Sequence, residues 1–219
     1  MSFIQPPFWA RPWSQAPAPH AISVLVTAPV LEPLTLEQAK RRAGLDWVSP
    51  DTDRDGLMNG FIAAARSEVE RRTELALLTQ TRDIYFDALP WDRPITLPAR
   101  SRPLQSVTSF KSTDTAGAVN TLDPSQYVVD LASGRLGLAL GGAWPTDLRP
   151  FQPYVLRIVA GYASVALLMA AEPVLVHLVG LLTAHFATLG RDLASIDPTT
   201  DVPMGFEDLI ASYLPVTVA

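Results

Sequence analysis

The chain has no cysteine among its 219 residues. Disulfide bonds, thiolate zinc sites and cysteine nucleophiles are therefore excluded from any account of its stability or chemistry. Hydrophobic residues make up 48% of the chain, so we expect a buried apolar core to supply the stability. The length suffices for one substantial domain with extended arms.

An excess of positive charge is also missing, because 17 Lys and Arg residues stand against 22 Asp and Glu residues, a formal net charge of −5. Non-specific DNA affinity comes from neutralising phosphates, so a protein that grips duplex DNA is not predicted. From residue 158 onward Arg191 is the only Lys or Arg. The acidic residues of that last part are Glu172, Asp192, Asp197, Asp201, Glu207 and Asp208.

No phosphate-binding glycine loop, GxSxG elbow or HExxH pair is present. His177 and His185 are eight residues apart, too far along a helix to share a metal as an i, i+4 pair does. The stretch Asp51–Gly56 copies the first half of an EF-hand loop, but Ile62 stands where the bidentate Glu is needed. The sequence thus predicts no catalytic residue, no metal site and no cofactor, and leaves a metal-dependent enzyme as an unfavoured alternative.

Pro173–Gly190 is an apolar run of 18 residues without Asp, Glu, Lys or Arg, at the lower edge of the length that spans a membrane. It contains two histidines and two threonines, and Glu172 precedes it. We expect a buried helix here and no membrane partner.

Residues 1–33 are predicted to form an extended proline- and aromatic-rich arm. Prolines prevent regular structure in residues 1–20, whereas large aromatic side chains are unfavourable in water. Two readings stay open, a disordered tail and a segment that becomes ordered on a partner. The candidate contact residues are Phe3, Phe8, Trp9 and Trp13. Ala21–Thr27, inside this range, reads as a short strand.

The middle of the chain, about 79–160, alternates like antiparallel β structure. Within it Leu122–Leu140 reads as a hairpin, with one strand from Tyr127, a second from Arg135 and Gly134 in the reversal. Helical patterns flank it near 50–75 and 165–189, and Thr35 and Gln38 form a capping box before a shorter helix. The predicted fold class is α+β: a small helical bundle with an inserted antiparallel β region, in one domain over 34–190.

Residues 191–219 are predicted to hold a linker, a short helix over Met204–Tyr213 and a tail. Five apolar residues of the segment Met204–Ala219 recur at the spacing of one helical face, which is the pattern of a helix that docks in a groove of a partner. The alternative is that the helix packs on its own domain. The five residues are Phe206, Leu209, Ile210, Tyr213 and Leu214.

Several short motifs stand in an order that resembles one family. They include Thr35–Lys40, Leu78–Thr81, Pro103–Thr108, Asp130–Leu136 and Pro203–Phe206. Over about residues 22–214 the chain is similar to the head–tail connector proteins of tailed phages and gene transfer agents, also called adaptors or head-completion proteins, of the kind with a β insert between helices. The arm at 1–20 is longer and more aromatic than the resemblance implies.

The resemblance implies a structural protein of the virion neck, assembled in the host bacterial cytoplasm, and no enzyme. Such proteins form a homo-oligomeric ring, usually a dodecamer, beneath the portal protein. The ring extends the DNA channel and gives a docking platform for the stopper or tail-terminator protein, and DNA passes without sequence-specific binding. The C-terminal segment, with the five residues above, would dock into the portal. Another neck or tail-completion protein is the nearest alternative.

Overall fold

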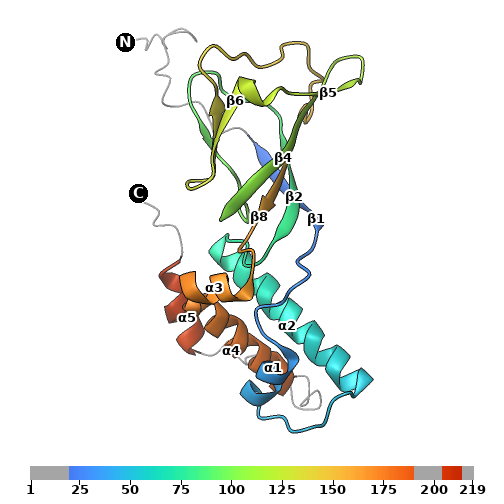
Figure 1. Cartoon of the computed structure of the whole chain (residues 1–219), viewed down its shortest axis with the longest axis vertical. Coiled ribbons are helices and arrows are strands. Elements are labelled where there is room, and N and C mark those ends of the chain that lie inside the picture. The colour runs from blue at the N-terminus through green and yellow to red at the C-terminus, as the bar shows by residue number, and fades with distance from the viewer. Residues whose placement is uncertain (1–19, 190–203, 214–219) are drawn as a thin grey trace, which may run out of the picture.

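The computed structural model describes residues 20–189 and 204–213. It confirms a mixed α+β class, with the helices at one end of an elongated molecule and two antiparallel sheets at the other (Figure 1). The helices are α1 Leu36–Arg42, α2 Thr52–Thr73, α3 Val165–Ala171, α4 Pro173–Leu189 and α5 Met204–Ala211. The strands are β1 Ala21–Thr27, β2 Gln80–Phe86, β3 Ile95–Thr96, β4 Leu104–Thr113, β5 Val119–Thr121, β6 Tyr127–Asp130, β7 Arg135–Leu138 and β8 Tyr154–Ala160.

The larger sheet has five strands in the order β1-β2-β8-β4-β5. Its centre is fixed by the register in which Ile84 of β2 and Phe110 of β4 both pair with Leu156 of β8. All three side chains are buried, so a shift by one residue would turn this apolar set toward solvent.

The range predicted for the arm, residues 1–33, contains a strand of the larger sheet, because β1 pairs with β2 along its length. The β region is therefore not confined to 79–160 as expected. Ala21–Thr27 does form the strand that its apolar run suggested. β1 is an edge strand of this sheet. Its side chains stay about half exposed, so it lacks the burial pattern of a central strand.

The smaller sheet, in the order β3-β7-β6, packs its apolar side on the larger one. Phe110 of β4 meets Tyr127 of β6 edge to face, with ring centroids 5.1 Å apart. The hairpin of β6 and β7 is confirmed, and Gly134 in its reversal adopts a φ of 64°. A short 3-10 turn, η3 at Pro124–Gln126, leads into it and is capped by Asp123.

Replacing Gly134 by Ala is expected to lower the free energy of unfolding by about 1 kcal/mol, because the left-handed conformation disfavours a Cβ. The added Cβ would also lie 2.9 Å from Cγ of Arg102. Chemical denaturation of both proteins measures the change. Gly117→Ala is the matched control: its φ is 86°, but no atom lies within 4 Å of the added Cβ, so the loss there should be smaller.

The helices enclose a second apolar core between α2 and α4, and α1, α3 and α5 contribute to it. Thr35 accepts a hydrogen bond from the backbone of Gln38, whose side chain accepts one from the Thr35 N–H, so the capping box is confirmed. Asp51 caps α2, which begins close to the predicted position.

The single long helix expected over 165–189 is wrong, and the predicted long-helix bundle is not confirmed. The chain forms α3 and then α4, bent by 110° at the break. Pro173 occupies the first position of α4, where its missing N–H is tolerated, and its ring disfavours a helical Glu172 before it. Among the described residues no single helix is long and apolar enough to span a membrane; only this bent pair meets both conditions together.

Candidate interaction surfaces and the junction that positions them

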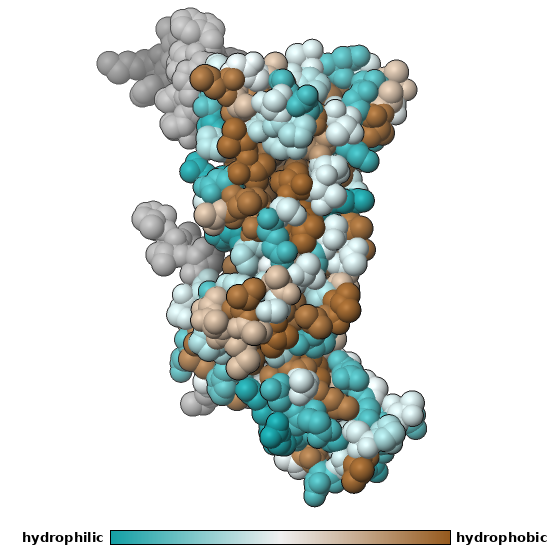
Figure 2. All heavy atoms as spheres, in the orientation of Figure 1, coloured by the Kyte–Doolittle hydropathy of each residue, from teal (hydrophilic) through white to brown (hydrophobic). Residues whose placement is uncertain are grey.

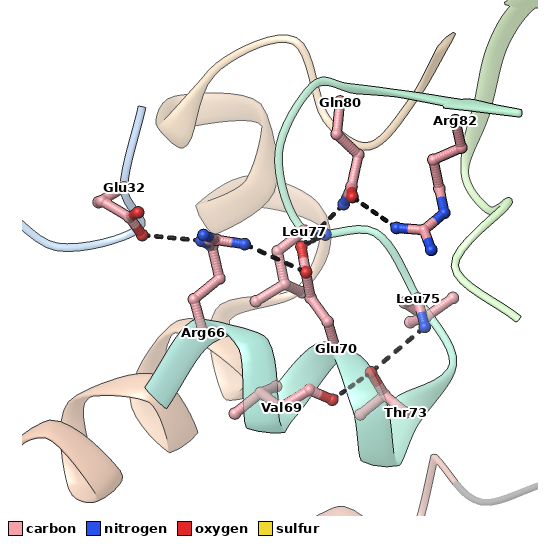
Figure 3. Close-up of polar contacts among 9 residues, drawn as sticks. All are labelled: Glu32, Arg66, Val69, Glu70, Thr73, Leu75, Leu77, Gln80 and Arg82. Carbon is pink, nitrogen blue, oxygen red and sulfur yellow. Dashed lines mark hydrogen bonds and ion pairs between the residues drawn. The ribbon is translucent and has the colours of Figure 1, made fainter. Parts of the chain in front are cut away.

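A buried polar network joins the helical part to the larger sheet (Figure 3). Its centre is Glu70 of α2, only 2% exposed, whose Oε1 accepts hydrogen bonds from the Leu77 backbone N–H at 2.9 Å and from Gln80 at 3.0 Å. The other carboxylate oxygen accepts from Nη1 of Arg66 at 3.2 Å. Arg66 also binds Glu32, in the connection after β1, at 2.8 Å. The network thus holds α2, β2 and the β1–α1 connection at fixed positions.

The network continues into the sheet through Arg82 of β2. Its guanidinium donates to the Gln80 side chain at 3.0 Å and to Oγ of Ser23 in β1 at 2.7 Å. Burial raises the pKa of Glu70, because desolvation outweighs its donors, and burial lowers the pKa of Arg82. No single-sequence pattern predicted this cluster, since its members come from four separate segments.

The predicted docking face of α5 lies against the chain's own helical core. Phe206 is fully buried, with the guanidinium carbon of Arg72 5.1 Å from its ring centroid, and Ile210 is buried beside it. Tyr213 donates a hydrogen bond to Glu172 at 2.8 Å, and burial together with this bond raises the pKa of Tyr213 to about 12. For these three residues the structure matches the alternative, packing on the same domain.

The other predicted contact residues divide into one exposed residue and several outside the described ranges. Leu209 is 36% exposed on the outer side of α5. Leu214 and the four arm residues Phe3, Phe8, Trp9 and Trp13 lie outside the described residues. Docking of these residues on a partner therefore stays a prediction.

Two of the acidic residues of the C-terminal third have partners within the chain. Glu172 accepts from Tyr213, and Glu207 forms an ion pair with Arg72. Asp208 is exposed, and Asp192, Asp197 and Asp201 lie outside the described residues. Glu172 and Glu207 are thus committed to holding α5 in place.

Asp51 and Asp55, at the start of α2, form hydrogen bonds that stabilise the first turn of the helix. Asp51 accepts from the Arg54 backbone N–H, and the Asp55 carboxylate accepts from Trp47 at 2.8 Å and from Ser49 at 3.1 Å. The pKa of Asp55 is lowered, first by the backbone hydrogen bond from Asp51 and then by the bond from Trp47. Within 20–189 and 204–213 no three His, Cys, Asp or Glu residues gather as a metal site would require.

Apolar side chains remain exposed on α3, which carries no polar residue. Leu168 alone of its seven residues is buried, while Leu167 and Met169 are more than half exposed. Half-exposed apolar residues also line β1. Exposed apolar side chains gathered on one element are candidates for protein–protein contacts.

A groove lies at the far end of the sheet part, between the segment that follows β2 and the long connection before β8. We call it the tryptophan–proline groove, and its main lining residues are Trp91, Trp144, Pro145, Leu148, Pro150 and Pro153. Figure 2 shows hydrophobic surface gathered over the sheet part on one face, whereas the tip of the helical part is largely hydrophilic. Sequence analysis missed the groove because its walls meet only in the folded chain.

Comparison with known proteins identifies solved structures with a similar fold but does not identify a family. No family model matches the chain, and no curated protein does. Among solved structures, a chain of the neck of an empty GTA particle computed with C6 symmetry matches with a TM-score of 0.70 and 24% identity. A chain of the virion of a native gene transfer agent (GTA) particle matches at 0.68 and 24%, and one of the native neck computed with C12 symmetry at 0.64 and 26%. Each match covers 90% of this chain and 97% of the other.

Proposed function

We propose that the chain is a structural subunit of the neck of a gene-transfer-agent or tailed-phage particle, acting by binding without a catalytic step. The observation that carries this proposal is the fold match over 97% of chains from such particles, two of them from necks. The match covers 90% of this chain, so it concerns most of the architecture rather than one common motif.

Within the neck we propose the role of adaptor, a ring beneath the portal that extends the DNA channel and receives the stopper or tail-terminator protein. Two observations support a ring. The neck structures were computed with C6 and C12 symmetry, and cyclic rings close through two different surfaces on each subunit. This chain exposes distinct apolar surfaces on α3 and on β1. The net negative charge suits a channel that DNA passes without being held.

Portal docking by the C-terminal segment needs a surface that the chain does not use itself. Phe206 and Ile210 are buried against α2 and α4, so in this proposal the portal contacts are Leu209 and the residues from Leu214 onward. The buried pair then holds the docking segment at a fixed exit point beside Glu172.

Counting copies in purified particles tests the proposal. Quantitative mass spectrometry should give about one copy of this chain per portal subunit, because rings stacked on one axis share the portal's symmetry. The portal itself is the internal standard, since both proteins are measured in the same digest. Absence from mature particles would contradict a neck role. Presence at another ratio would keep the virion location and favour a different neck or tail-completion protein.

A further inference from the structure

The first 19 residues have a composition that suits one mode of recognition. They contain five prolines and only one charged side chain, Arg11. Proline fixes φ near the polyproline II value, so such a segment loses little conformational entropy when it binds. Four large aromatic residues stand among the prolines, namely Phe3, Phe8, Trp9 and Trp13.

The tryptophan–proline groove has the complementary chemistry. Proline-rich segments dock in grooves lined by aromatic rings. Trp144 is held in place, because its Nε1 donates to the Pro90 carbonyl at 2.9 Å and its ring contacts Phe110 at 5.9 Å between centroids. Trp91, at the groove's border, is 72% exposed. The groove is therefore formed in advance and presents wide aromatic surface.

The arm leaves the folded chain at the edge of this groove. Asp87, one of the lining residues, donates its backbone N–H to the His20 carbonyl at 3.4 Å. One oxygen of its carboxylate lies 3.4 Å from Nδ1 of His20, and the other accepts from the Gln152 backbone N–H at 3.1 Å. Gln152 belongs to the connection that forms the opposite wall. The same aspartate thus joins the end of the arm to both sides of the groove.

The arm is long enough to fill the groove without a linker. In polyproline II geometry, 19 residues extend about 59 Å. A segment tethered this closely has an effective concentration of about a millimolar, so weak contacts suffice for occupancy.

We propose that residues 1–19 bind in the tryptophan–proline groove of their own chain, with the prolines and aromatic side chains of the arm packed on Trp91 and Trp144. This contact does not depend on the location of the protein in a particle. Its consequence is that a surface at the far end of the sheet part is covered by the chain itself, and a partner that needs the groove must displace the arm.

Photo-crosslinking in the full-length purified chain tests the contact. The probe p-benzoylphenylalanine replaces Thr146, an exposed lining residue, and in a control protein it replaces Asp53, exposed at the far end of α2. The sample mixes chains labelled with heavy and ordinary nitrogen. We expect crosslinks from position 146 to peptides within 1–19, with both halves carrying the same isotope, and none from position 53.

Variants of the arm identify the side chains that hold it. Replacing Trp9 and Trp13 by Ser should lower the yield of the crosslink from position 146 roughly tenfold, as expected for the loss of aromatic anchors. Replacing Gln5 and Gln15 by Ser, a polar pair in the same segment, should leave the yield unchanged. Absence of any crosslink to the arm would overturn the proposal. So would crosslinks of which about half join a heavy and an ordinary peptide, the proportion expected in an equal mixture when the arm of a second copy occupies the groove.

Discussion

Phe206→Ala is expected to lower the free energy of unfolding by about 3–5 kcal/mol, the loss typical of a fully buried phenylalanine. The side chain has no exposed surface and packs among α2 and α4 residues under the Arg72 guanidinium. For a chain of this size the loss corresponds to a fall in Tm of about 10 °C. Thermal and chemical unfolding of the isolated protein measure it.

Leu209→Ala supplies the matched control on the same helix. Leu209 is 36% exposed, so its truncation should change the free energy of unfolding by less than about 1 kcal/mol. If Phe206→Ala left the stability of the free protein unchanged and weakened only portal binding, α5 would be a detachable docking helix. The packing described for its buried face would then not hold in solution.

Glu70→Ala is expected to destabilise the chain by about 3 kcal/mol, because it leaves buried donors of Leu77 and Gln80 without an acceptor. Arg66 keeps Glu32 as a partner, which limits the loss. Asp53→Ala, in the exposed first turn of the same helix, is the control and should change the free energy of unfolding by less than about 1 kcal/mol. Denaturant titration near pH 7 compares the three proteins.

The pH dependence of stability separates the charge of Glu70 from its hydrogen bonds. Burial raises its pKa in the folded state above the ordinary value of 4.5, so the folded chain binds more protons than the unfolded chain between those two values. Glu70 therefore makes its full contribution to the free energy of unfolding below pH 4.5, and this contribution falls as the pH rises through the raised pKa. Glu70→Gln lacks this component and keeps an acceptor, so the stability advantage of the original chain over Gln should shrink with rising pH. If the stability advantage of the original chain over Glu70→Gln grew with rising pH, Arg66 and the backbone donor would be lowering the pKa of Glu70 instead.

Local signals in the sequence predicted the local structure well. The capping box at Thr35 and the β6–β7 hairpin around Gly134 each depend on residues a few positions apart, and both are confirmed. The long helix over 165–189 failed at Pro173 for a definite reason. Apolar periodicity continues across Glu172 and Pro173, but a proline that starts one helix also ends the preceding one.

The contacts of exposed and apolar surfaces were harder to predict, because residue composition does not identify the partner that a surface binds. The apolar face of α5 was predicted to dock on a partner, yet Phe206 and Ile210 pack on the core of the same chain. The Glu70 network and the tryptophan–proline groove join residues far apart in the sequence: Asp87 and Gln152 are 65 positions apart. Contacts of this separation leave no periodic trace in a single sequence.

The position of β8 in the larger sheet also sets the order in which the chain can fold during synthesis. β8 lies between β2 and β4, so these two strands have no common partner until residues 154–160 leave the ribosome. The helical core closes later still, because α4 follows β8 along the chain. A nascent chain halted before β8 would expose the apolar sides of β2 and β4 together with their unpaired edges, the surfaces from which aggregation begins. The last third of the chain is thus the part that completes both cores.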